Sequence, residues 1–136
     1  MNKITQSLVL ANELYEEKRK FDIEPVINHC KRLASIGVLL DFDELSLAAC
    51  YLHEVLTYNY GDYYNIGLRI KEIDPKLFIL VDKLTKKHSE TWPEYYYRIR
   101  VVPEVKKIEY INMLDELAYA PKEDRERIFA HLKYFI

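Results

Sequence analysis

The chain has 136 residues, 49% of them hydrophobic, and its 20 basic and 22 acidic residues leave a formal charge of -2. This length suits one domain with one core, and this hydrophobic content excludes wholesale disorder. The balanced charge gives no electrostatic basis for binding nucleic acid or a membrane surface. We therefore expect a single domain over residues 1–136, with neither nucleic acid nor membrane as its partner.

The chain contains two cysteines, Cys30 and Cys50, and both fall in apolar stretches. Two thiols are too few for a disulfide framework, so we expect buried free thiols and a reducing environment. The first residues contain no apolar segment of signal-peptide type, and no run reaches the roughly 18 apolar residues that a membrane-spanning helix needs. These features predict a cytoplasmic protein.

Apolar residues recur at helical spacing along nearly the whole chain, and the breaks between these segments are short. Strand signals are weak throughout, and there is no linker or internal repeat. The predicted helices cover residues 4–18, 25 to about 35, 41 or 43 to about 56, 63–71, 75 to about 85, 92 to about 101, 104–119 and a last segment after 121. This pattern predicts an all-α fold, a single bundle of about seven or eight helices.

Several of these helices have a specific signal at one end. Gly37 is placed to end the second helix, and Asp41 or Asp43 can cap the third. Thr91 and Glu94, three residues apart, form a capping-box pattern ahead of a tyrosine-rich helix. Loops are expected at residues 59–62 and 86–89.

The chain contains 12 tyrosines, several of them clustered at residues 58–64 and 95–97. Packing at the edge of the core is one interpretation, because a tyrosine can bury its ring and keep its hydroxyl in contact with water. The other is a surface that stacks bases, or the interface with a protein partner or a second copy of the chain. The sequence leaves both interpretations open.

His29 and the pair His53-Glu54 lie on separate predicted helices, and Glu109 lies on a third. Imidazole nitrogens and carboxylate oxygens together suit a divalent ion such as Mn, Fe, Zn or Mg. Such an ion can neutralise a phosphate ester and activate a water for its hydrolysis. Each histidine also fits a core residue satisfied by a hydrogen bond, so convergence of these side chains would distinguish the two interpretations.

The chain contains, in order, an Arg19-Lys20 pair ahead of Pro25 and His29, the pair His53-Glu54 after an apolar stretch, and Glu109 on a later segment. This series resembles the HD-domain phosphohydrolases, most closely the alarmone (ppGpp) hydrolase domain of the Rel/Spo type and its small stand-alone relatives. In that family an arginine-lysine turn and a proline precede the first metal histidine, a later helix ends in His-Asp, and another supplies the last metal aspartate. The matching residues here are Arg19-Lys20, Pro25, His29 and His53-Glu54. The resemblance covers about residues 8–118, in segments 19–34, 47–54, 80–85, 90–99 and 106–112.

The resemblance implies a metal site and a substrate class. The implied metal ligands are His29, His53, Glu54 and Glu109. The implied phosphate-binding residues are Arg19 and Lys20, which would face a nucleotide or polyphosphorylated nucleotide. Glu54 and Glu109 stand where the family has aspartate, so each carboxylate reaches one methylene farther, and Asn112 stands where the family has histidine.

The acidic pair that works on the attacking water in this family is replaced here by Thr57 and Tyr58, neither of which is a general base near pH 7. Asp62 is the remaining candidate catalytic residue. Three functions therefore stay open: an active metal-dependent phosphohydrolase, an HD-type domain that has lost the reaction and binds a nucleotide or protein partner, and a helical interaction module.

Overall fold

The computed structural model describes residues 1–135, and within them the fold is all-α, as predicted, apart from one short hairpin. Eight of the helices in this range have eight residues or more, and α4 is a single turn. The elements are α1 (Lys3–Leu14), β1 (Arg19–Lys20), β2 (Glu24–Pro25), α2 (Val26–Leu39), α3 (Glu44–Leu52), α4 (Val55–Tyr58), the 3₁₀ helix η1 (Tyr60–Asp62), α5 (Tyr63–Ile73), α6 (Pro75–Leu84), α7 (Trp92–Ile99), α8 (Pro103–Tyr119) and α9 (Lys122–Leu132).

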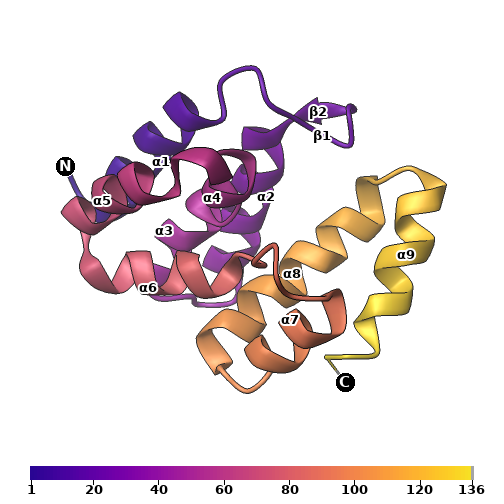
Figure 1. Ribbon diagram of the computed structural model, residues 1–136. Helices are drawn as coiled ribbons and strands as arrows, with labels where there is room; N and C mark the ends of the chain where they lie inside the picture. Colours follow the sequence, from indigo (N-terminus) through magenta and orange to yellow (C-terminus); the bar gives the residue numbers. More distant parts are fainter. Residues whose placement is uncertain (136) are drawn as a thin grey trace.

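Helix α3 lies at the centre of the packing and contacts α1, α2, α6 and α8. Its alanines Ala48 and Ala49 are fully buried, and such small side chains let neighbouring helices approach closely. Helix α8 packs along α2, and Figure 1 shows α7, α8 and α9 on the opposite side of the molecule from α1 and α5. The contact between α2 and α8 therefore joins the early and late parts of the chain.

The segment between the first two helices departs from the prediction. Helix α1 ends at Leu14 instead of continuing to residue 18, and β1 and β2 pair antiparallel after it. The turn between the strands has Phe21 and Asp22 at φ of 53° and 58°. Two successive residues with positive φ make a tight hairpin turn, which directs the Lys20 side chain into the protein.

Gly37 does not end the second helix, so that prediction was wrong. Helix α2 continues to Leu39, and the backbone turns at Asp41, which has φ of 58°. A Cβ atom on Gly37 would lie 2.9 Å from side-chain atoms of both Leu47 and Phe42. The glycine therefore allows the start of α3 to pack closely against α2.

The third predicted helix is divided in two. Helix α3 ends at Leu52, His53 and Glu54 form a turn, and α4 begins at Val55. His53 is therefore not inside a regular helix, as the apolar spacing predicted. The turn places the side chains of His53 and Glu54 at the same end of α3. In a continuous helix, adjacent side chains would point about 100° apart.

Other predictions are confirmed. The Asp43 side chain accepts a hydrogen bond from the Ser46 amide, and Thr91 heads a complete capping box. Cys30 and Cys50 are free and buried. No helix within residues 1–135 has the length and hydropathy needed to cross a membrane.

The tyrosine triplet of α7 supports the packing interpretation in part. Tyr95 and Tyr96 are buried, whereas Tyr97 is 49% exposed. The Tyr95 hydroxyl donates a hydrogen bond to the Leu84 carbonyl at 2.7 Å. The triplet therefore does not form a continuous exposed surface.

Candidate metal centre

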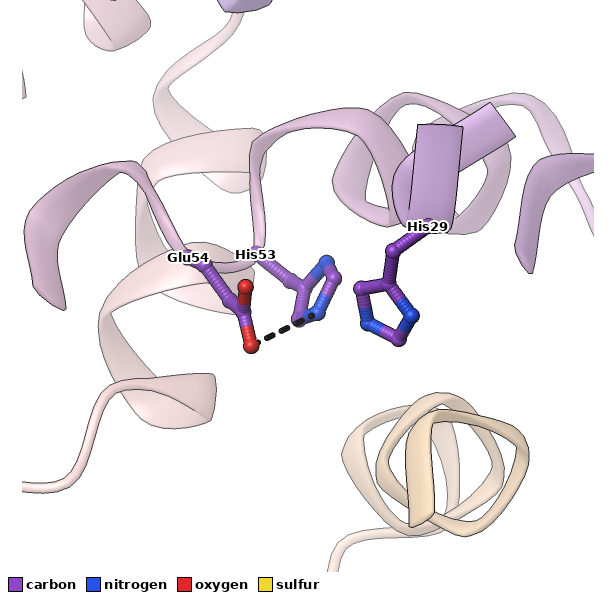
Figure 2. Close-up of side chains that lie close together, drawn as sticks. All are labelled: His29, His53 and Glu54. Carbon is purple, nitrogen blue, oxygen red and sulfur yellow. Dashed lines mark ion pairs between the residues drawn. The ribbon is translucent and has the colours of Figure 1, made fainter. Parts of the chain in front are cut away.

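Two imidazoles and a carboxylate converge beside α8. His29 comes from α2, and His53 and Glu54 come from the turn between α3 and α4 (Figure 2). One ligand-type atom from each residue lies within 4.8 Å of those of the other two. His53 Nε2 is 3.7 Å from Glu54 Oε1, and the two imidazole centroids are 5.3 Å apart. Three of the four predicted metal ligands are thus brought together.

The hydrogen bonds of His53 determine which of its ring nitrogens is available. Its Nδ1 lies 2.9 Å from the carbonyl oxygen of Cys50, which can only accept, so Nδ1 carries a proton. Burial lowers the pKa of His53 to about 4, so the ring is neutral near pH 7. Its Nε2 therefore has a lone pair directed away from the backbone.

His29 is held in a similar way by a carboxylate. Its Nδ1 lies 2.6 Å from Asp115 Oδ2, and Arg32 Nε donates to the other Asp115 oxygen at 2.9 Å. Burial alone would raise the pKa of Asp115, but hydrogen bonds from His29 and Arg32 lower it to about 2. An ionised carboxylate on Nδ1 fixes the ring and directs Nε2 toward a metal in many metalloproteins.

The two Nε2 atoms meet at the side chain of Asn112. Its Oδ1 lies 2.7 Å from His29 Nε2 and 3.0 Å from His53 Nε2. Its amide nitrogen donates to Glu109 at 3.1 Å and to Glu116 at 2.8 Å, and these partners assign the oxygen to the imidazole side. The unprotonated His53 Nε2 therefore faces an oxygen that has no proton to give. A cation among these atoms would satisfy both lone pairs.

Glu54 also has an unsatisfied atom. Its Oε1 accepts a hydrogen bond from the Lys20 ammonium, while its Oε2 is buried and has no hydrogen-bond partner. Burial would raise the pKa of Glu54, but the neighbouring Lys20 charge lowers it to about 2. The carboxylate is therefore ionised and has a free oxygen, as a metal ligand requires.

Glu109 is not a member of the converging group, although it was predicted to be a ligand. Its carboxyl lies one turn before Asn112 on α8 and accepts a hydrogen bond from Asn112, and its Oε2 lies 3.2 Å from the Tyr95 hydroxyl. Burial, together with the charge of Glu116, raises the pKa of Glu109 to about 8. It is therefore mostly protonated at neutral pH, whereas a metal ligand would be ionised.

Asn112 and Asp115 contact His29 directly and were not predicted as site residues. Both are buried polar residues on α8, in a stretch that also buries Ile108, Ile111 and Met113. Polar residues three apart on a buried helix face were the available signal in the sequence. The family motif drew attention instead to Glu109, one turn earlier.

A cavity of about 430 Å³ adjoins the converging group. The two residues predicted to bind phosphate differ in their position relative to it. Lys20 lines it, but its ammonium pairs with Glu54 and lies 3.1 Å from Glu116 Oε2. Arg19 does not line it and donates instead to the carbonyl of Ile23. The full lining is Lys20, Phe21, His53, Glu54, Thr57, Tyr58, Tyr60, Leu84, Lys86, His88, Trp92, Tyr95, Tyr96, Glu109, Asn112, Glu116, Arg127 and Ile128.

The candidate bases in this region are weak. Asp62 is exposed on η1, accepts from Asn65, and does not line the cavity. Thr57 and Tyr58 do line it, and burial raises the pKa of Tyr58 to about 12. None of these three residues gives the cavity a carboxylate that could take a proton from water.

Comparison of the chain with protein-family models, with curated proteins and with solved structures found no match.

Proposed function

We propose that this chain is an HD-type domain that binds one divalent metal ion through His29, His53 and Glu54, with Asn112 as a further ligand. The observation that supports this most strongly is the orientation of the imidazoles. Both Nδ1 atoms donate to acceptors, and both Nε2 atoms point at the Asn112 oxygen. The set of two nitrogens and two oxygens suits Mn, Fe or Zn better than Mg, which prefers oxygen alone.

We propose further that the ligand of the adjoining cavity is a phosphorylated small molecule such as a nucleotide. When bound, the metal would supply positive charge to phosphate oxygens. The volume of about 430 Å³ falls in the usual range of about 300–1,000 Å³ for small-ligand pockets. Tyr60, Trp92 and Tyr96 provide aromatic surface on its wall, which suits the planar ring of a base.

Binding is better supported than hydrolysis, because the cavity is poor in free carboxylates. Glu54 and Glu116 share the Lys20 ammonium, and Glu109 is mostly protonated. Hydrolysis is a second candidate function, and Glu116 is the residue that favours it. Glu116 lines the cavity and would be the base if a ligand displaced Lys20 from it.

Metal titration tests the proposal. Isothermal calorimetry with Mn²⁺ and Zn²⁺, supported by metal analysis, should show one ion per chain in the wild type. His53→Ala should lower the affinity by about 100-fold or more, because it removes a ligand that the fold holds in place. His88→Ala is the matched control: His88 lines the same cavity but makes no contact with the converging group. Wild-type protein that binds no divalent ion would contradict the proposal.

A nucleotide assay separates the two candidate functions. Metal-loaded protein should bind a nucleoside diphosphate, and phosphate release would be measured in parallel. Release that requires metal and is lost in both His29→Ala and Glu116→Gln would establish hydrolysis. Binding without release would establish the domain as a binder.

A further inference from the structure

Arg19 and Lys20, which the resemblance implies to bind phosphate, already have hydrogen-bond or ion-pair partners within the protein. The Arg19 guanidinium donates to the Ile23 carbonyl at 2.7 Å and lies outside the cavity. Lys20 is 8% exposed and its ammonium lies between the carboxylates of Glu54 and Glu116. One ammonium against two carboxylates leaves the inner end of the cavity negative before a cation binds. This end favours a metal ion and repels an unaccompanied phosphate.

Two other cations, Lys86 and Arg127, line the same cavity. Lys86 lies in the loop between α6 and α7, and its ammonium donates to the Lys87 carbonyl at 3.3 Å and lies over the face of the Trp92 ring. No carboxylate of residues 1–135 forms an ion pair with it. Arg127 on α9 is exposed, and its one ion pair in this range is a 3.5 Å contact with Asp124. Both cations are therefore available to an anion.

Aromatic side chains line the cavity together with these two cations. Trp92 and Tyr96 both line the cavity, with ring centroids 5.7 Å apart and nearly parallel planes. The Lys86 ammonium lies 5.2 Å from the centre of the Trp92 ring. Arg127 lines the same cavity as Tyr96. Lys86 and Arg127 thus line the same cavity as this aromatic surface, and they come from two separate segments of the chain.

We propose that Lys86 and Arg127 form an anion-binding subsite in the lining of the cavity, and that they, rather than Arg19 and Lys20, hold a phosphate group of its ligand. The inference rests on the proposed function, because it takes that ligand to be a phosphorylated small molecule. Arg127 can donate two parallel hydrogen bonds to phosphate oxygens, and Lys86 adds a point charge. Arg127 lies outside residues 8–118, the part of the chain in which the family resemblance is found. The resemblance therefore does not imply a role for Arg127.

The test compares two double variants that lose the same charge. Lys86→Gln with Arg127→Gln removes the subsite. Lys83→Gln with Arg125→Gln is the control, because both of its residues are exposed neighbours on α6 and α9 that do not line the cavity. Calorimetry would measure the affinity for Mn²⁺, and then the affinity for ADP with and without Mn²⁺. Circular dichroism would verify that each variant folds.

The subsite variant should bind Mn²⁺ as the wild type does and bind ADP about ten-fold or more weakly, which corresponds to about 1.4 kcal/mol or more. Its ADP affinity should also depend less on salt. The control should match the wild type in both respects. Equal ADP affinity in the two double variants, or wild-type protein that binds Mn²⁺ but no ADP, would overturn the subsite.

Failure of the metal proposal has a different signature. If the wild type binds no Mn²⁺, the proposed metal site is wrong, and the metal-free ADP titration decides the subsite. A loss of ADP binding in the subsite variant but not in the control supports it. Any other pattern in that titration overturns it.

Discussion

His29 and His53 present the same nitrogen to one point, but different groups hold them there. A backbone carbonyl fixes His53, and the Asp115 carboxylate fixes His29 with support from Arg32. Arg32 also pairs with Glu24 beside the hairpin. The orientation of His29 therefore depends on side chains from α2, α8 and β2, none of which touches the proposed metal.

Asp115→Asn tests this orienting role. The amide keeps the shape of the side chain but loses the charge that holds the Nδ1 proton of His29. We expect the affinity for Mn²⁺ to fall by about 10- to 100-fold. The packing around the His29 ring should change little, because the two side chains have the same shape. Glu24→Gln is the control, because it neutralises the other acidic partner of Arg32 and leaves the contact between Asp115 and His29 intact. Equal losses in the two variants would contradict a specific role for Asp115.

Glu109 should give the metal-free protein a pH-dependent stability. Its pKa is raised by burial from an ordinary value of 4.5 to about 8, so between these values the folded state holds a proton that the unfolded state has lost. Stability therefore falls as pH rises through this range, with a slope of at most about 1.4 kcal/mol per pH unit for one group.

Glu109→Gln should remove this contribution. In urea denaturation with a chelator present, the stability of the variant relative to the wild type should increase from pH 5 to pH 8. His53 and the other titrating groups are common to both proteins, so the difference between the two isolates Glu109. A difference that stays constant across this range would contradict the assignment.

At the scale of elements, the side-chain caps at helix starts could be predicted from the sequence, whereas other boundaries, such as the end of α2 beyond Gly37, could not. The caps at Asp43 and Thr91 were predictable because each depends on residues within one turn. The hairpin was not, because strands of two residues have no periodicity to detect. The break at His53 was hidden for a similar reason, since the apolar spacing continues through it.

Gly37→Ala tests the close packing of α2 against α3. Alanine favours a helix interior by about 1 kcal/mol, but overpacking a core typically costs about 1–3 kcal/mol. Because the new methyl would lie 2.9 Å from both Leu47 and Phe42, we expect a net loss of about 1 kcal/mol in urea denaturation. Gly61→Ala is the control, since no atom lies within 4 Å of its added methyl. A more stable Gly37→Ala protein would contradict the packing described.

For the whole molecule, the site depends on three segments far apart in the chain: α2, the turn after α3, and α8. The sequence predicted His29, His53 and Glu54 as ligands, because each stands at a ligand position of the family that the chain resembles. It did not identify Asn112, because the rotation of α8 about its own axis is set by packing against α2 and α3. Successive side chains of a helix point about 100° apart around its axis. A motif alone therefore does not determine which side chain of α8 reaches the site.

Metal binding should stabilise the fold as a whole, because the ligands meet only when these three segments are in place. A ligand present at about 100 times its Kd adds about 2.7 kcal/mol to the stability. Thermal unfolding of the wild type should therefore shift upward as Mn²⁺ is added, and His29→Ala should show a much smaller shift. Equal shifts in the two proteins would mean that the ion binds elsewhere.

The most direct test of the metal centre is a crystal structure of the Mn²⁺-loaded protein with anomalous data collected at the manganese edge. We predict one strong anomalous peak in contact with Nε2 of His29, Nε2 of His53 and a carboxylate oxygen of Glu54. A map from fully loaded crystals with no peak among these three side chains, or with its peak elsewhere, would contradict the account.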